Sequence, residues 1–163
     1  MKTMNLFKSV STLPVLIAVV SVIGFSSCEK DNDEIIEDTY TLSGTASGVQ
    51  VVPEVTTTAT GSITGSYNAR NNQMQYNFSW TGLTESAMDS VSIYGPATAG
   101  ANGNLIGRVA VTTPGISGSA MGGATLSEEE EAVLLDNEWY FVVGNSTYPD
   151  GEIRGQITAS KND

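Results

Sequence analysis

Near its C-terminal end the chain places a carboxylate and a guanidinium two residues apart, at Glu152 and Arg154. Residues two apart on a β-strand face the same side of the sheet, so this pair could form a charged site on one face. In one interpretation, Arg154 binds an anionic ligand. In the other, the pair is structural and ties the last hairpin to a neighbouring strand or to backbone carbonyls.

Three tyrosines lie on or beside predicted strands, at Tyr94, Tyr140 and Tyr148. Aromatic faces of this kind could form a sugar-binding patch. Tyrosine is also an ordinary residue of exposed strands because its side chain favours β-structure. Tyr94 and Tyr148 are therefore candidate ligand residues, with a purely structural role as the alternative.

The densest acidic cluster of the predicted domain is Glu128–Glu131, followed by Asp136 and Glu138. Calcium takes roughly six to eight oxygen ligands from a loop that turns them inward, and no Asp-x-Asp-x-Asp-Gly loop is present. Consecutive residues of a helix point around the cylinder instead. We expect the solvated start of a helix here, with a carboxylate-based cation site as the alternative.

Nucleophilic catalysis by serine needs a base such as His or Lys. The chain contains no His, and beyond residue 27 its only lysines are Lys30 and Lys161. Imidazole and thiolate are also the ligands that hold copper or zinc, and the only thiol is Cys28. No motif points to the paired carboxylates of a glycosidase. We expect no enzymatic activity, no catalytic residue, no metal ligand and no cofactor.

The N-terminus has the pattern of an export signal. Lys2 and Lys8 precede an apolar run, Leu13–Phe25, and two small residues then lead to Cys28. The run is shorter than the roughly 20 residues that a membrane span needs and suits a cleaved secretory segment. An uncleaved anchor helix is the alternative.

The segment Phe25-Ser26-Ser27-Cys28 resembles the lipobox of bacterial lipoproteins, although Phe stands where Leu is usual. The resemblance implies a signal peptide over residues 1–27, cleavage before Cys28, and acyl chains such as palmitate on that cysteine. Several acyl chains on one residue give stable membrane anchoring. We predict that the mature chain is attached to a membrane through lipid on Cys28.

The stretch after Cys28 is rich in acids as far as Asp38, and we predict a tether over residues 28–38. It resembles the acidic segment of surface-exposed lipoproteins of Bacteroidetes, which implies the outer membrane and its outer face. The mature chain would carry five Lys and Arg against eighteen Asp and Glu, a net charge of −13. Such a surface repels nucleic acid and anionic headgroups, so we expect neither as a partner.

From Thr39 onward apolar residues recur with period two, most clearly in Gln73–Trp80, where Met74, Tyr76, Phe78 and Trp80 alternate with polar residues. This pattern predicts a half-buried antiparallel strand. Asn71-Asn72 predicts a hairpin turn that joins it to a strand over Thr57–Tyr67. Further strands are predicted over Tyr40–Ser43, Val49–Val52, Ser90–Tyr94, Leu105–Thr112, Ser117–Ala124, Trp139–Gly144 and Glu152–Ala159.

These short strands, separated by Gly- and Pro-containing turns, predict one all-β domain over residues 39–160. Its expected form is an antiparallel Greek-key β-sandwich or a flattened barrel. One segment breaks the pattern, because residues 128–135 read as a short helix. Ser127 and Glu130 have the spacing of a capping box, and the neighbouring glutamates suit the positive end of the helix dipole.

Several segments taken in order resemble the CHRD domain, a family named from chordin. They include Leu42-Ser43-Gly44, Val52-Pro53-Glu54-Val55, Ile93-Tyr94-Gly95-Pro96-Ala97 and Pro149-Asp150-Gly151-Glu152-Ile153-Arg154-Gly155-Gln156. The resemblance covers nearly all of residues 39–160. It implies a fold similar to the sandwich of copper/zinc superoxide dismutase.

The chain departs from that family's pattern. Relatives usually show His-x-His before Gly-Pro-Ala, where this chain has Ser92 and Tyr94, and Asn and His on the penultimate strand, where it has Val142 and Gly144. The metal or redox role that the pattern implies for some relatives lacks its ligands here. We therefore expect a lipid-anchored, non-catalytic binding or structural module for an envelope protein or glycan. The alternative is a degenerate metal-binding domain with a carboxylate cation site.

Overall fold

The computed structural model describes residues 38–163. The predicted signal peptide, the predicted lipidation site Cys28 and all of the predicted tether except Asp38 lie outside the described residues. Within the described part, no helix is long and apolar enough to cross a membrane.

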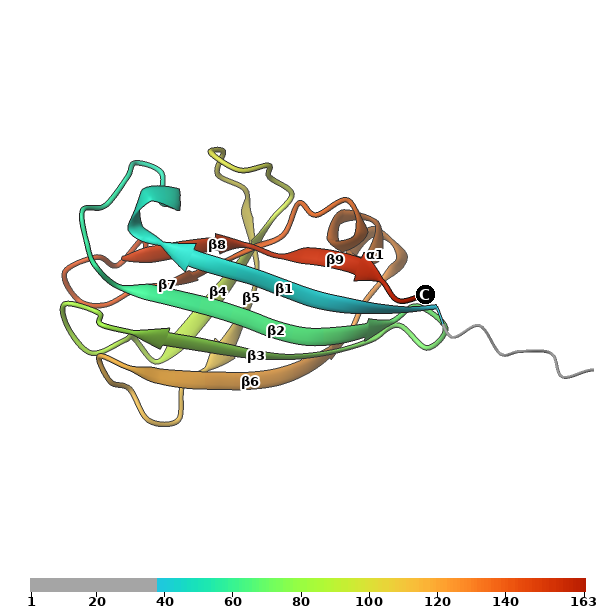
Figure 1. The fold of residues 1–163 in the computed structure, drawn as a ribbon, viewed down its shortest axis with the longest axis horizontal. Coiled ribbons are helices and arrows are strands. Elements are labelled where there is room, and N and C mark those ends of the chain that lie inside the picture. The colour runs from blue at the N-terminus through green and yellow to red at the C-terminus, as the bar shows by residue number, and fades with distance from the viewer. Residues whose placement is uncertain (1–37) are drawn as a thin grey trace, which may run out of the picture. The chain divides into compact units, whose positions relative to one another are not determined.

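Residues 38–163 form nine strands, one α-helix and one short 3-10 helix (Figure 1). In chain order these are β1 (Thr39–Ser47), the 3-10 helix (Gly48–Gln50), β2 (Thr60–Asn68), β3 (Gln73–Thr81), β4 (Ser90–Gly95), β5 (Asn104–Ala110), β6 (Gly118–Thr125), α1 (Glu128–Leu135), β7 (Tyr140–Val143), β8 (Ile153–Gln156) and β9 (Thr158–Lys161).

The strands form a single antiparallel sheet in the order β5-β4-β7-β8-β1-β2-β3-β6, and β9 pairs with β1 beside β8. The sheet curls into a nearly closed barrel whose two edge strands are β5 and β6. The predicted all-β class with one short helix is confirmed. Of the two forms expected, the structure has the flattened barrel, because the strands belong to one connected sheet.

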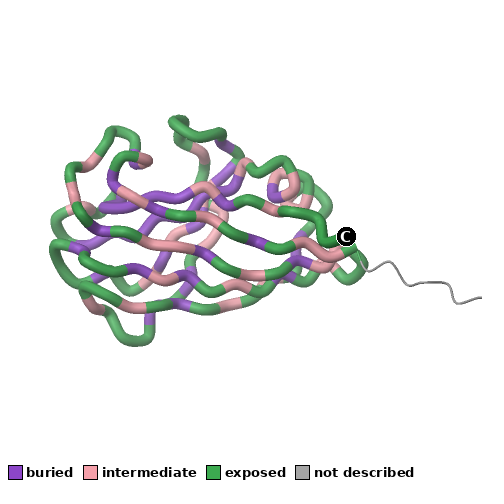
Figure 2. Tube along the Cα trace, in the orientation of Figure 1, coloured by how far each residue is buried: buried purple, intermediate pink, exposed green. Residues whose placement is uncertain are grey.

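The alternation in β3 determines which face of the sheet is buried (Figure 2). Met74, Phe78 and Trp80 are almost completely buried, and the Phe78 ring lies 5.0 Å from the ring of Phe141 on β7. Burial of each large apolar side chain is worth about 1.5–3 kcal/mol, so these contacts across the barrel hold its two sides together.

Two local predictions are confirmed. Asn72 adopts a positive φ of 58° in the turn between β2 and β3, which pair in register along their full length. Helix α1 spans the predicted residues 128–135, and Ser127 and Glu130 form the capping box reciprocally through side chain and backbone. Leu134 buries the inner side of the helix in the core.

The predicted strand Val49–Val52 is wrong. The backbone N–H groups of Val51 and Val55 both donate to the carbonyl of Gly48, at 3.1 and 3.0 Å, so the chain turns back on itself there. A Cβ at Gly48 would lie 2.1 Å from the Val55 carbonyl oxygen. This close approach of the backbone overrides the β propensity of the valines.

The predicted strand Glu152–Ala159 is two strands, β8 and β9, interrupted at Ile157. The N–H of Ile157 donates to the carbonyl of Trp139 instead of to β1. The strand predicted from Thr57 begins only at Thr60, because Thr57 lies in the loop after the 3-10 helix and points its hydroxyl toward Glu152.

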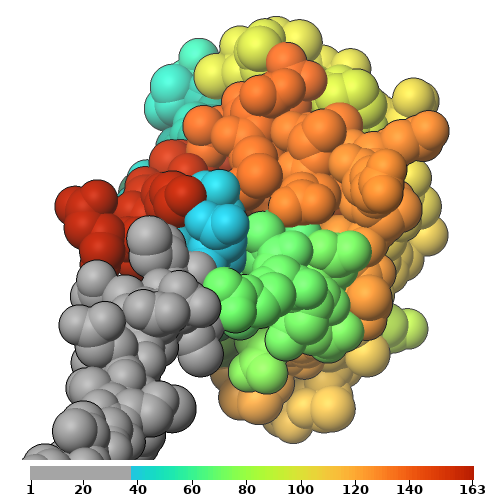
Figure 3. Space-filling view, turned by 90° about the vertical axis from the view of Figure 1, so that its right-hand side faces the viewer, coloured from blue at the N-terminus to red at the C-terminus, as the bar shows by residue number. Residues whose placement is uncertain are grey.

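The start of β1 and the C-terminus are joined at one end of the domain (Figure 3). The Asn162 N–H donates to the Thr39 carbonyl at 2.9 Å, and the Asn162 side chain bonds the Thr39 and Thr41 hydroxyls. Lys161 and Asp38 form an exposed ion pair, which raises the pKa of Lys161 and lowers that of Asp38. Lys161 and Asn162 thus hold the start of β1 in place.

Candidate functional site

The outer face of β4, β7 and β8 brings together side chains that are far apart in sequence. Register pairs Tyr94 with Tyr140, and pairs Val142 with both Ser92 and Arg154. The intervening residues Ile93, Phe141 and Ile153 point into the core. Strand alternation therefore sends Tyr94, Tyr140 and Arg154 to the same outer surface.

Three planar groups stack across this surface. The rings of Tyr94 and Tyr140 have centroids 5.3 Å apart and planes 12° apart. The guanidinium carbon of Arg154 lies 3.6 Å from the Tyr140 ring centroid. A cation over an aromatic face is attracted by the ring quadrupole, most strongly when water is excluded. The stack fixes one side of the site.

Arg154 is buried, with only 2% of its surface exposed. Its guanidinium donates to the carbonyls of Ala101 and Thr98, at 2.6 and 3.5 Å, and to the side-chain oxygen of Asn102 at 3.1 Å. Within residues 38–163 no carboxylate forms an ion pair with it. Burial lowers the pKa of Arg154, and the neighbouring Tyr140 opposes that effect. Its positive charge is thus stabilised by carbonyl dipoles and the aromatic face.

Hydrogen bonds hold the loop between β4 and β5 over the stack. Gly103 N–H donates to the Tyr140 hydroxyl at 3.1 Å, and the Gln156 side-chain amide donates to the Ala97 carbonyl at 2.8 Å. The Asn102 amide also reaches the Val52 carbonyl at 3.2 Å. Asn102 therefore connects Arg154 to the loop that follows β1.

A second buried charge, Glu152, lies just before β8 and is fully buried. Its carboxylate accepts hydrogen bonds from the Thr57 hydroxyl at 2.6 Å, from the Thr84 hydroxyl and N–H, both at 3.0 Å, and from the Asn145 amide. Hydrogen bonds to ionised groups are the strong ones. Neutral donors from three separate loops therefore satisfy this carboxylate.

Asn145 connects the Glu152 carboxylate to the loop between β7 and β8. Its side-chain oxygen accepts from the N–H groups of Thr147 and Tyr148, at 3.1 and 2.8 Å, while its amide donates to Glu152 and Thr84. Gly151, with φ of 126°, closes the turn and donates to the Tyr148 carbonyl at 3.0 Å. The Glu152 carboxylate thereby positions the loop that carries Tyr148.

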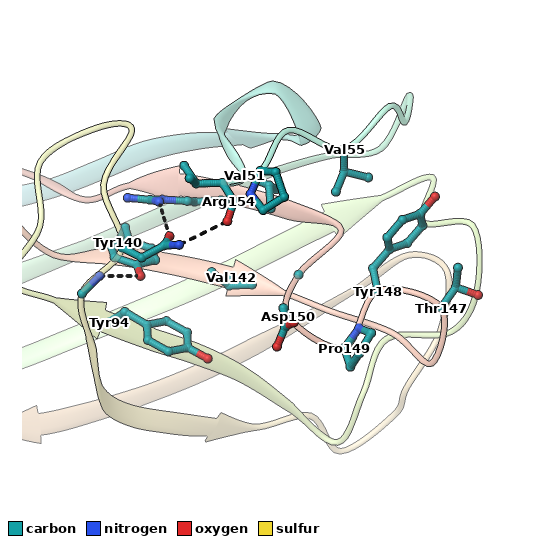
Figure 4. Close-up of a pocket in the computed structure, with 15 residues that line it drawn as sticks. Val51, Val55, Tyr94, Tyr140, Val142, Thr147, Tyr148, Pro149, Asp150 and Arg154 are labelled. Carbon is teal, nitrogen blue, oxygen red and sulfur yellow. Dashed lines mark hydrogen bonds between the residues drawn. The ribbon is translucent and has the colours of Figure 1, made fainter.

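These elements enclose a pocket of about 470 Å³ (Figure 4). Tyr94 lies toward one end of the view and Tyr148 toward the other, with Pro149 and Asp150 between them. The volume falls in the range of roughly 300–1,000 Å³ that small-ligand sites occupy. The pocket is lined by Val51, Val52, Pro53, Val55, Tyr94, Asn102, Gly103, Tyr140, Val142, Thr147, Tyr148, Pro149, Asp150, Gly151 and Arg154.

The structure thus places Tyr94, Tyr148 and Arg154 among the lining residues of one pocket, whereas Glu152 does not line it. Glu152 and Arg154 do not pair with each other within the described part of the chain, because each bonds its own set of loops. A ligand-binding role for Tyr94, Tyr148 or Arg154 stays a prediction.

Sequence reasoning missed Asn145, Asn102, Thr57 and Thr84, the polar residues that complete the two networks. Asn145 carried a usable signal, because Asn commonly bonds the backbone two residues on and begins a turn. Thr57 and Thr84 gave none, since their role depends on loops that meet only in the folded barrel.

Two members of the acidic cluster near α1 cap the helix itself. The Glu130 carboxylate accepts from the Ser127 N–H at 2.8 Å, and Asp136 occupies the C-cap position. Across residues 38–163, no group of three or more His, Cys, Asp or Glu gathers in a way that could hold a metal ion.

The protein is therefore a small barrel-like β-domain with a pocket on the outer face of its sheet. A model of the CHRD domain matches residues 42–157, and the chain belongs to that family. No curated protein and no solved structure matches the chain. Ser92 and Tyr94, at the expected positions of the family's His-x-His, and Val142, at the expected position of its Asn, lie on the neighbouring strands β4 and β7 next to this pocket.

Proposed function

We propose that this CHRD-domain protein is a lipid-anchored module of the cell envelope that binds a protein or glycan and performs no chemistry of its own. The observation that carries the binding role is the pocket over β4, β7 and β8. Its walls are preorganised by the Tyr94–Tyr140–Arg154 stack and by the Glu152 network. Preorganised walls reduce the ordering cost that binding must overcome.

The residues at the pocket support binding over catalysis. Thr147, Tyr94 and Tyr148 offer hydroxyl groups, but the chain has no His to activate them. Of the lysines, Lys161 pairs with Asp38 at the end of the domain where the chain enters. A hydroxyl without an adjacent base is a weak nucleophile but a good hydrogen-bonding group.

The binding role is tested by capture of envelope components on the purified full chain, compared with the variant Tyr148→Ala. We expect Tyr148→Ala to lose at least tenfold of the captured ligand while the melting temperature changes little, because this side chain is only half-buried. Met121→Ala is the matched control, since Met121 is 74% exposed and does not line the pocket. Equal capture by both variants and the parent would contradict the proposal.

The anchoring and location rest on the sequence pattern around Cys28. Metabolic labelling with palmitate should mark the parent chain, and Cys28→Ala should abolish the label and release the protein from the membrane fraction. Protease added to intact cells should digest the parent if the domain is displayed on the outer face of the outer membrane. Protection in intact cells and digestion after lysis would argue against surface display.

A further inference from the structure

The charges of the pocket differ in how far a ligand can reach them. Among residues 38–163, the charged side chains that line it are Arg154 and Asp150. Arg154 is 2% exposed, and its donors are directed at Ala101, Thr98 and Asn102. The positive charge of Arg154 is therefore buried in the pocket wall, and its donors are already bonded to the protein.

Asp150 is the opposite case. It is exposed at the tip of the loop between β7 and β8, and among residues 38–163 it has neither a hydrogen bond nor an ion pair. Gly151 and the Asn145 turn fix the backbone on either side of it. The charge that a ligand meets in this pocket is negative.

The rest of the lining combines apolar surface with free hydroxyl groups. Pro149, Pro53 and Val142 contribute apolar area. The hydroxyls of Tyr94 and Tyr148 have no hydrogen-bond partner within the described residues. A fitting ligand presents C–H groups to the aromatic and proline surfaces and several O–H donors to the carboxylate, and it carries no negative charge.

A neutral sugar has these properties. Its O–H groups can donate to the Asp150 carboxylate in charge-assisted hydrogen bonds, about twice as strong as neutral ones. Its C–H faces match the negative face of a tyrosine ring. An acidic sugar would bring its carboxylate next to Asp150, where like charges repel, and the described part of the chain lines the pocket with no exposed cation to compensate.

We propose that the pocket recognises a neutral sugar unit of a glycan and discriminates against acidic sugars, with Asp150 as the residue that sets this specificity. The proposal rests on the proposed binding function and names its ligand class. Capture of a protein without any sugar binding would overturn this proposal and leave the proposed binding function standing.

The test is isothermal titration of the purified full chain with two matched sets of oligosaccharides, one built of glucose, galactose or N-acetylglucosamine and one of the corresponding uronic acids. We expect neutral members to bind and their acidic counterparts to bind at least tenfold more weakly at low salt. Asp150→Asn should weaken neutral binding by about tenfold and reduce the ratio between the two sets. Asp89→Asn, an exposed position outside the pocket lining, should change neither.

Acidic oligosaccharides that bind as tightly as neutral ones, or a ratio unchanged by Asp150→Asn, would overturn the proposal. So would the absence of sugar binding alongside capture of a protein that Tyr148→Ala abolishes, which leaves the binding function standing. If Tyr148→Ala affects the capture of neither sugar nor protein, the binding function fails as well.

Discussion

The side-chain amide of Asn145 donates to the carboxylate of Glu152, and both side chains are completely buried. The same Asn145 orders the turn that carries Tyr148. The buried carboxylate just before β8 and the tyrosine ring at the pocket are thereby parts of one arrangement.

This relationship predicts that Glu152→Gln destabilises the domain. The amide NH₂ would face donors from Thr84 and Asn145, and each buried group left unsatisfied costs about 1–3 kcal/mol. We expect the free energy of unfolding to fall by about 2 kcal/mol or more, measured by urea denaturation. Glu54→Gln is the control, because Glu54 is exposed and makes no hydrogen bond among the described residues. A loss no larger than that of the control would contradict a structural role for this carboxylate.

Arg154→Lys tests the stack. Lysine keeps the charge but cannot present a planar group to Tyr140 or donate in several directions at once. We expect a loss of about 1–3 kcal/mol in the free energy of unfolding, with increased hydrogen exchange at Gly103 as the loop loosens. The exposed Arg108 provides the matched replacement, Arg108→Lys, which should leave both measurements unchanged. Equal effects at the two positions would show that the stack contributes little.

The helix cap is tested by Ser127→Ala. The substitution removes the acceptor for the Glu130 N–H, and loss of such a cap costs about 0.5–2 kcal/mol. The expected effect is a lower denaturation midpoint with the pocket intact, so ligand capture should not change. Glu129→Gln, next to the cap but outside the capping box, should cost less, and the reverse order would contradict the assignment.

Alkaline pH should weaken the fold through Tyr67. Burial, with a further contribution from Glu131, raises the pKa of Tyr67 to about 12 from its ordinary value of 10.0. Between these values the folded chain retains the phenol proton that the unfolded chain has lost, so stability falls as pH rises. The total loss is on the order of 2–3 kcal/mol.

Urea denaturation at pH 8, 10 and 11 measures about half of this loss, because the rest comes only as the pH passes the folded-state pKa. Tyr67→Phe should reduce the drop between pH 8 and pH 11 because it removes the titrating group. Tyr76, whose pKa burial also raises, contributes in the same direction, so some alkaline loss should remain. An identical pH profile for the parent and Tyr67→Phe would contradict this assignment.

The parts of the fold that could be predicted are those governed by local pattern. The alternation from Met74 to Trp80 and the spacing of Ser127 and Glu130 each determine structure within a few residues, so β3 and α1 were predicted closely. The turn at Gly48 was missed because valine's preference for strands is weaker than the contacts that fold the chain back toward Val55.

The candidate site was predictable only in part for the same reason. Tyr94, Tyr148 and Arg154 stand out by type, and β alternation assigns Arg154 to a face. Nothing local shows that Tyr140 lies between Tyr94 and Arg154, because that contact arises from the pairing of β4, β7 and β8. That Asp150 is exposed to a ligand while Arg154 is buried also depends on how the loops pack, which the local sequence does not show.

The junction of Thr39 with Asn162 has a consequence for reach. β1 runs for nine residues from that junction, roughly 30 Å at about 3.3 Å per residue, before the chain enters the turn that lines the pocket. The junction of the two chain ends and the turn that lines the pocket therefore lie at opposite ends of β1, so a label attached after Asp163 would lie far from the pocket.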